Sequence, residues 1–170
     1  MRVFVLLLAV LLSGCTGLPD KVTPVKPFVT ERYLGTWYEI ARLDHSFEQG
    51  LEQVTAEYQP RDDGGIRVLN RGLDKKSGEY KEAEGKAYFV GNTDEAHLKV
   101  SFLGPFYSSY IVFELDEDYQ YAFVAGYNHD YLWLLSRAPT VSLELKKHFA
   151  EKANQLGFRT EDLIWVKQSK

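Results

Sequence analysis

From Gly35 onward, the sequence is a series of short apolar runs rich in β-branched and aromatic residues, separated by clusters of Gly, Asp, Asn and Pro. Such a series is typical of an all-β protein. We expect eight strands, at residues 36–44, 53–59, 66–71, 80–90, 97–103, 109–115, 121–127 and 131–137. The alternation is clearest at Leu98, Val100 and Phe102, which share one face while polar residues between them point the other way.

One helix is expected after the eighth strand. Four apolar residues form a stripe with helical spacing among lysines and glutamates: Leu145, Phe149, Ala153 and Leu156. Ser142 is the expected N-cap, and Gly157 supplies a C-terminal stop. We expect the helix to pack on the sheet and residues 163–166 to form a short last strand.

Eight antiparallel strands, a helix and a short strand suit an eight-stranded antiparallel up-and-down β-barrel with a flanking helix. Full closure of the sheet leaves no exposed strand edges, which favours the barrel. A two-layer sandwich of the same strands is the alternative.

The single cysteine, Cys15, closes the tetrad Leu12-Ser13-Gly14-Cys15 directly after an apolar run at residues 3–12. This run follows Arg2 and is about half as long as the roughly 20 residues that a membrane-spanning helix needs. The tetrad resembles the lipobox of bacterial lipoproteins, whose cysteine is acylated and becomes the first mature residue. By that resemblance, residues 1–14 are a lipoprotein signal peptide and Cys15 is the lipid attachment site. An uncleaved anchor and an ordinary secretory peptide are the alternatives.

The composition excludes several classes of function. The sole methionine is Met1, so residues 16–170 contain no sulfur, which excludes disulfides, thiolate nucleophiles and cysteine metal sites. Without residues 1–14, the chain keeps 19 basic and 24 acidic residues, a balance that does not indicate nucleic-acid binding. The length from Cys15 onward suits one domain.

Residues 16–30 contain half of the six prolines and show no sustained periodicity. We therefore expect residues 15–30 to be the lipidated cysteine and a tether, and residues 31–170 to be the barrel domain. At about 3.1 Å per residue, the tether would reach roughly 45 Å from the lipid surface. Phe28 and Val29 suggest the alternative that part of this stretch packs along the domain.

Three motifs resemble those of the lipocalin family. They are Gly35-Thr36-Trp37-Tyr38 at the first strand, Leu115-Asp116-Glu117-Asp118-Tyr119 between strands six and seven, and Leu134-Leu135-Ser136-Arg137 at the end of strand eight. The resemblance covers roughly residues 32–168, and with the tetrad the chain is similar to bacterial outer-membrane lipocalin lipoproteins. It implies a barrel that binds a lipophilic ligand, and a homodimer.

The two ends of the expected barrel have different roles. Trp37 and Arg137 fall at the same end if the strands alternate up and down, and a guanidinium over an indole is worth about 0.5–2 kcal/mol. We expect Gly35, Trp37 and Arg137 to form a structural floor. The other end, the mouth, carries the loops at residues 44–52, 72–79, 104–107 and 128–130.

An eight-stranded barrel has room for its own side chains or for one small ligand. From the alternation of faces, we expect a ligand-binding wall made of Ala56, Tyr58, Phe89, Val100, Phe102, Tyr110, Val112, Tyr131 and Trp133. Glu39 and Ala41 should face inward with Trp37. For Glu39 and Glu114, a structural or exposed role is favoured over contact with a ligand headgroup.

Two pairs on the mouth loops have side chains that bind metals. They are His45 with Glu48, and His129 with Asp130. Solvated loop residues are the favoured interpretation of both pairs. We expect no metal site and no cofactor.

An apolar cavity with polar groups near its mouth suits a fatty acid or a lysophospholipid. Sixteen buried methylenes at about 0.8 kcal/mol each give a gross term near 13 kcal/mol, which immobilisation partly offsets. The sequence thus predicts a membrane-anchored lipid-binding protein that stores or transports lipids. The alternatives are a lipocalin-type enzyme, although no catalytic motif is present, and a barrel filled by its own side chains. The residue after Cys15 is Thr16 and not an aspartate, a feature that resembles outer-membrane lipoproteins of bacteria with two membranes. This resemblance implies a location on the periplasmic side of the outer membrane.

Overall fold

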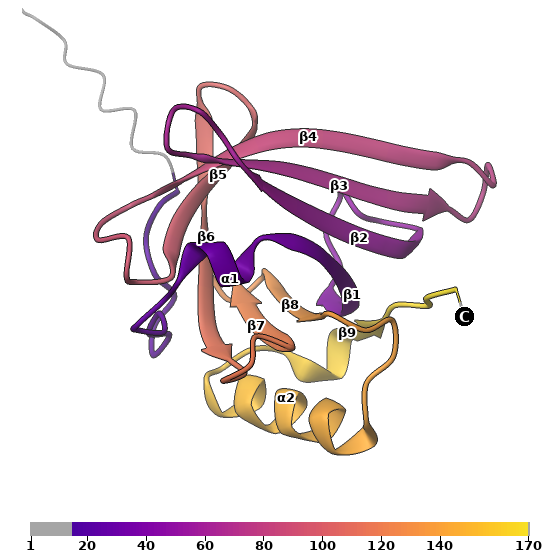
Figure 1. Cartoon of the computed structure of the whole chain (residues 1–170). Coiled ribbons are helices and arrows are strands. Elements are labelled where there is room, and N and C mark those ends of the chain that lie inside the picture. Colours follow the sequence, from indigo (N-terminus) through magenta and orange to yellow (C-terminus); the bar gives the residue numbers. More distant parts are fainter. Residues whose placement is uncertain (1–14, 170) are drawn as a thin grey trace, which may run out of the picture.

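In a computed structural model, which describes residues 15–169, the chain forms a closed antiparallel barrel with one helix against its wall (Figure 1). The sheet runs in the order β2-β3-β4-β5-β6-β7-β8-β1, and β1 also pairs with β2, which closes the barrel. This confirms the up-and-down barrel over the sandwich. The apolar run and the first three residues of the tetrad lie outside the described residues.

The eight expected strands are all present, and their ends shift by at most three residues. The strands are β1 (Gly35–Leu43), β2 (Leu51–Pro60), β3 (Ile66–Asp74), β4 (Tyr80–Phe89), β5 (His97–Leu103), β6 (Phe106–Leu115), β7 (Tyr121–Ala125), β8 (Leu132–Ser136) and β9 (Leu163–Trp165). The helical elements are α1 (Thr30–Tyr33), α2 (Leu143–Gln155) and the 3-10 turn η1 (Thr160–Asp162). Within residues 15–169, no helix combines the length and the apolar character needed to cross a bilayer.

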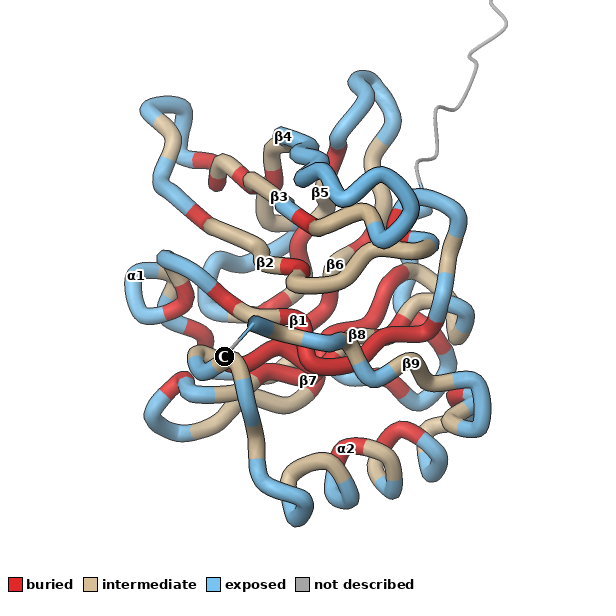
Figure 2. The backbone as a smooth tube through the Cα atoms, turned by 90° about the vertical axis from the view of Figure 1, so that its right-hand side faces the viewer, coloured by how far each residue is buried: buried red, intermediate tan, exposed pale blue. Residues whose placement is uncertain are grey.

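Helix α2 forms for the reasons expected from its sequence. The Ser142 hydroxyl accepts a hydrogen bond from the Leu145 backbone N–H at 3.1 Å, and Gly157 ends the helix at φ +95°. The apolar stripe docks on the outer face of the barrel, where Phe149 and Ala153 are fully buried. Figure 2 shows buried positions concentrated on β1, β7 and β8, which lie between the barrel interior and α2.

A β-bulge in β1 changes which of its side chains face inward. Its pairing with β8 slips between Glu39 and Ala41, so both Ile40 and Ala41 face the helix and Arg42 turns into the barrel. The expectation that Ala41 faces inward is therefore wrong, because one extra residue inverts the alternation beyond Glu39.

Residues 16–30, for which the sequence predicts a tether, run along the barrel. Val22 is buried in the core under α2, and Phe28 is buried in the core inside the barrel. The Val25 backbone bonds to Val112 O at 2.9 Å and accepts from Ala96 N at 3.0 Å. The segment therefore packs along the domain, which is the alternative to a tether. Single apolar side chains between the prolines hold this extended segment on the barrel.

The barrel wall contains a seam near the mouth. Strand β1 pairs with β2 only over residues 35–38, and beyond the bulge that edge pairs with β9 instead. The segment after β9 fills the gap, since the Gln168 side-chain amide donates to Glu39 O at 2.7 Å and to Val54 O at 2.9 Å. The Gln53 backbone N–H also donates to Lys167 O at 2.7 Å.

Candidate functional site: a hollow barrel with an open mouth

The barrel encloses a cavity of about 790 Å³ that reaches the loops at its mouth. This volume lies within the range of roughly 300–1,000 Å³ that is usual for small-molecule sites. Most of its lining is aliphatic or aromatic, so the interior is a hollow apolar space and is not filled by side chains. Seven of the expected wall residues line it, namely Ala56, Tyr58, Val100, Phe102, Tyr110, Tyr131 and Trp133.

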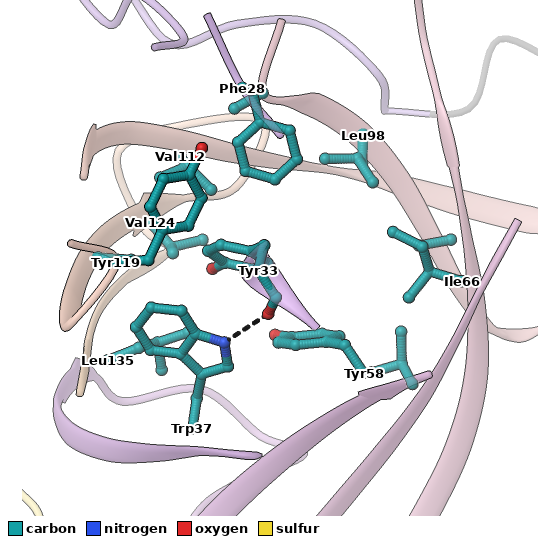
Figure 3. Close-up of a cluster of buried hydrophobic side chains, with 14 residues drawn as sticks. Phe28, Tyr33, Trp37, Tyr58, Ile66, Leu98, Val112, Tyr119, Val124 and Leu135 are labelled. Atoms are coloured by element: carbon teal, nitrogen blue, oxygen red, sulfur yellow. Dashed lines mark hydrogen bonds between the residues drawn. The ribbon is translucent and has the colours of Figure 1, made fainter. Parts of the chain in front are cut away.

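The other two expected wall residues, Phe89 and Val112, do not line the cavity. Both belong to the apolar cluster at the floor end, where the Phe28 ring lies 6.1 Å from that of Phe89. Phe28 comes from the N-terminal segment, which covers this part of the interior. The cavity therefore ends above these residues, on a layer that includes Tyr33 from α1 (Figure 3).

The floor brings Gly35, Trp37 and Arg137 together. The Arg137 guanidinium lies 4.0 Å above the Trp37 ring and donates to four carbonyl oxygens, those of Thr36 (3.0 Å), Arg32 (2.9 Å), Leu34 (2.8 Å) and Tyr119 (3.3 Å). A Cβ at Gly35 would lie 3.3 Å from Arg137 Nη1, and its φ of +95° favours glycine. The Trp37 indole N–H donates to Tyr33 O at 2.8 Å (Figure 3).

Three tyrosine hydroxyls meet at the deep end of the cavity. The Tyr110 oxygen lies 2.6 Å from that of Tyr33 and 2.9 Å from that of Tyr58. Burial raises the pKa of all three hydroxyls, so each keeps its proton at neutral pH. Two hydrogen bonds use two of the three protons, which leaves one proton available to a ligand oxygen.

A buried polar cluster forms the wall between the floor and the mouth. Arg42 donates to Glu39 Oε1 at 3.0 Å and to Glu48 O at 2.9 Å. The Trp133 indole donates to Glu48 Oε2 at 3.0 Å, and His45 Nε2 lies 2.7 Å from the same oxygen. Of these residues, Glu39, Glu48 and Trp133 line the cavity.

The two carboxyl groups of this cluster titrate in opposite directions. Burial, followed by the charge of Glu48, raises the pKa of Glu39 well above its ordinary value. Burial also disfavours the charged form of Glu48, but the close contact with His45 and the hydrogen bond from Trp133 outweigh it and lower the pKa of this carboxyl. The two carboxyl groups of the cavity wall therefore differ in how readily they bind a proton, Glu39 more readily and Glu48 less readily than an ordinary glutamate.

The two polar pairs of the mouth loops differ in their surroundings, and one of them departs from the prediction. His45 and Glu48 are buried, so the interpretation as solvated loop residues is wrong for this pair. His129 points its Nε2 at Leu156 O, 2.9 Å away, and Asp130 pairs with Arg159 on the surface. Over residues 15–169, no cluster of three or more His, Cys, Asp or Glu side chains is placed to hold a metal ion.

Glu114 lies outside the barrel. Its carboxylate contacts His148 of α2, and Tyr121 donates to it at 3.5 Å. Of Glu39 and Glu114, Glu39 is the residue that lines the cavity.

A comparison with models of known protein families decides the family to which this chain belongs. The family model of the lipocalin-like domain matches residues 29–168, almost the whole described chain. The chain is a lipocalin.

Relatives of this lipocalin include lipoproteins of the bacterial envelope. It is 60% identical to the outer membrane lipoprotein Blc of Vibrio cholerae, over 98% of each chain. It is 53% identical to the protein of that name from Escherichia coli K12, over 88% of this chain and 85% of the relative. Among solved structures, the cockroach allergen Per a 4 shares the fold with a TM-score of 0.68 at 21% identity, over 89% of this lipocalin and 96% of the allergen.

Sequence reasoning missed Arg42 and Tyr33 as parts of the lipocalin's interior. Arg42 faces inward only because of the bulge, which has no sequence signal in β1. Tyr33 lies on α1, a helix of four residues that is too short to show a periodic pattern. The two aromatic residues Phe28 and Tyr33 are the signal that could have placed this segment inside the barrel.

Proposed function

We propose that this lipocalin is a membrane-anchored lipid-binding protein that holds a fatty acid or a lysophospholipid for storage or transport at the cell envelope. The observation that carries the proposal is the apolar cavity of about 790 Å³ with an open mouth. An acyl chain suits its aliphatic and aromatic wall, and the headgroup would lie at the rim. The Blc relatives are named outer membrane lipoproteins, which supports the same location for this chain.

The anchor in this proposal is a set of acyl chains on Cys15, facing the periplasm from the outer membrane. One acyl chain binds a membrane only marginally, whereas two or more hold a protein stably. A homodimer is part of the same proposal. The competing proposal of an enzyme has less support, because the sequence contains no catalytic motif.

The test is a titration of the Cys15→Ser chain with lysophosphatidylethanolamine and with palmitate, followed by tryptophan fluorescence. Trp133 lines the cavity and should report the entry of a ligand. Saturable binding in the micromolar range or tighter is the expected result. A chain that binds neither lipid, and that carries no lipid in a native mass spectrum after purification from membranes, would refute the proposal.

Filling the cavity should weaken lipid binding without unfolding the barrel. Ala56 lines the cavity, whereas Thr55 follows the alternation to the outer face, so Ala56→Phe and Thr55→Phe form a matched pair. We expect the first variant to lose at least about tenfold in affinity, about 1.4 kcal/mol, and the second to bind normally. Equal affinities in the titration would place the ligand elsewhere.

A further inference from the structure

We propose that the barrel rim around the turn between β5 and β6 is a membrane-docking surface. In this arrangement the mouth of the cavity opens directly onto the lipid leaflet. The inference rests on the acylation of Cys15 in the proposed function, and it adds an orientation that acylation alone does not impose.

Cys15 lies on the rim itself. Its carbonyl accepts a hydrogen bond from Ser109 N at 2.9 Å, and the residue forms a parallel bridge with Ser108 at the mouth end of β6. The Ser109 hydroxyl also donates to Gly17 O at 2.7 Å, which holds the next residues against the strand. In Figure 1, the indigo segment that begins at Cys15 runs beside β6. Acyl chains on Cys15 would therefore leave the protein from the edge of the cavity.

The same rim presents apolar side chains to solvent. Leu103 is 74% exposed and Phe106 is 67% exposed in the turn between β5 and β6, and Phe47 on the loop before β2 is 64% exposed. All three line the mouth of the cavity, as does Cys15. Large side chains in water gain free energy when they enter an apolar phase, and a cluster of them marks an interaction site.

A lipid surface fits this rim better than a second protein copy does. Residues at a bilayer interface bury their apolar side chains about 5–10 Å into the boundary between headgroups and acyl chains, a depth that the tip of a turn can reach. The proposed anchor on the neighbouring segment already holds the rim close to the membrane, which raises the effective concentration of lipid at the rim. Even a weak insertion of Leu103 and Phe106 is therefore sufficient to keep the rim on the membrane surface. With the mouth held there, a lipid passes between leaflet and cavity without crossing water.

Two glycines at opposite ends of β5 provide a matched pair of reporter positions. Gly104 lies in the docking turn, and Gly91 lies in the turn between β4 and β5 at the floor end. Both have open space where a Cβ would stand, and neither has a positive φ. Because residues 16–170 contain no sulfur, a cysteine at either position is the one free thiol once Cys15 is acylated.

The experiment uses the acylated full chain with Gly104→Cys or Gly91→Cys. Each protein carries an environment-sensitive fluorophore and is reconstituted into vesicles of phosphatidylethanolamine and phosphatidylglycerol that contain lipids with brominated acyl chains. We expect blue-shifted and strongly quenched emission at position 104, and neither change at position 91. The double substitution Leu103→Asp/Phe106→Asp should abolish the quenching at 104, whereas Leu143→Asp, at an equally exposed leucine on α2, should not.

Flotation of the vesicles and thermal unfolding accompany each measurement. A protein that floats but is quenched equally at both positions, or at neither, overturns docking and leaves the anchor and the lipid site in place. The docking proposal is also overturned if the fluorophore at position 104 is still quenched in the Leu103→Asp/Phe106→Asp variant. A blue shift that needs no vesicles and grows with protein concentration would assign the rim to a second copy. A chain that does not float would refute the anchor and docking together, while the lipid titration still tests the cavity.

Discussion

Replacing Arg42 with methionine should lower the free energy of unfolding by about 3–5 kcal/mol, the usual effect of removing one member of a buried charged cluster. The Arg42 side chain is fully buried, with Glu39 Oε1 at 3.0 Å and Glu48 O at 2.9 Å. Its loss leaves the Glu39 carboxyl group in the barrel wall without its cation and the Glu48 carbonyl without this donor. Urea unfolding of the Cys15→Ser chain, followed by circular dichroism, measures the effect.

Two further variants test this explanation. Arg67 pairs with Glu84 at 2.8 Å on the barrel surface, where both side chains are partly exposed, so Arg67→Met should cost less than about 1 kcal/mol. Combining Arg42→Met with Glu39→Gln should recover part of the loss, because a neutral amide needs no buried cation. An Arg42 variant that unfolds no more easily than the Arg67 variant would show that the cluster is not important for stability.

Trp37→Ala should lower the free energy of unfolding by about 3–5 kcal/mol as well, through the cavity that it leaves in the floor. The indole is completely buried, donates to Tyr33 O at 2.8 Å and supports the Arg137 guanidinium 4.0 Å above it. It lies below the ligand cavity, so the affinity for lysophospholipid should change less than the stability.

Trp133→Ala should show the reverse pattern, since this indole lines the cavity. Urea unfolding and the lipid titration, performed on both variants, separate the two roles. Trp165→Ala serves as a control, because this side chain is 42% exposed on β9 and its loss should cost less stability. If the ratio of stability loss to affinity loss is the same in Trp37→Ala and Trp133→Ala, the floor and the cavity wall do not have separate roles in stability and binding.

The strands and α2 could be predicted from sequence because their signals are local. Alternating residues such as Leu98 and Val100 define a strand face, and Ser142 with Gly157 define the ends of a helix, without reference to the rest of the chain. The Trp37–Arg137 contact could also be predicted, since an up-and-down order of strands determines which ends coincide.

The features that sequence reasoning missed depend on tertiary contacts. The bulge at Ile40 is compensated by pairing with β8 and β9, and the surroundings of the buried Glu48 carboxylate include Trp133, which lies 85 residues further along the chain. The N-terminal segment has no periodicity of its own and is ordered by the barrel surface on which it lies. Inward positions of the first strand and polar groups on the mouth loops are therefore the least predictable parts of the site.

The seam between β1 and β2 has a consequence for how the barrel folds. The amide of Gln168 joins two carbonyl groups that lie 129 and 114 residues earlier in the chain. Contacts of such sequence separation form late and slowly, because a long loop must close first. During synthesis, the wall between the first two strands is therefore complete only after residue 168 has left the ribosome. A shortened chain that lacks this residue would lose the bridging amide and would leave the cavity wall open along the seam.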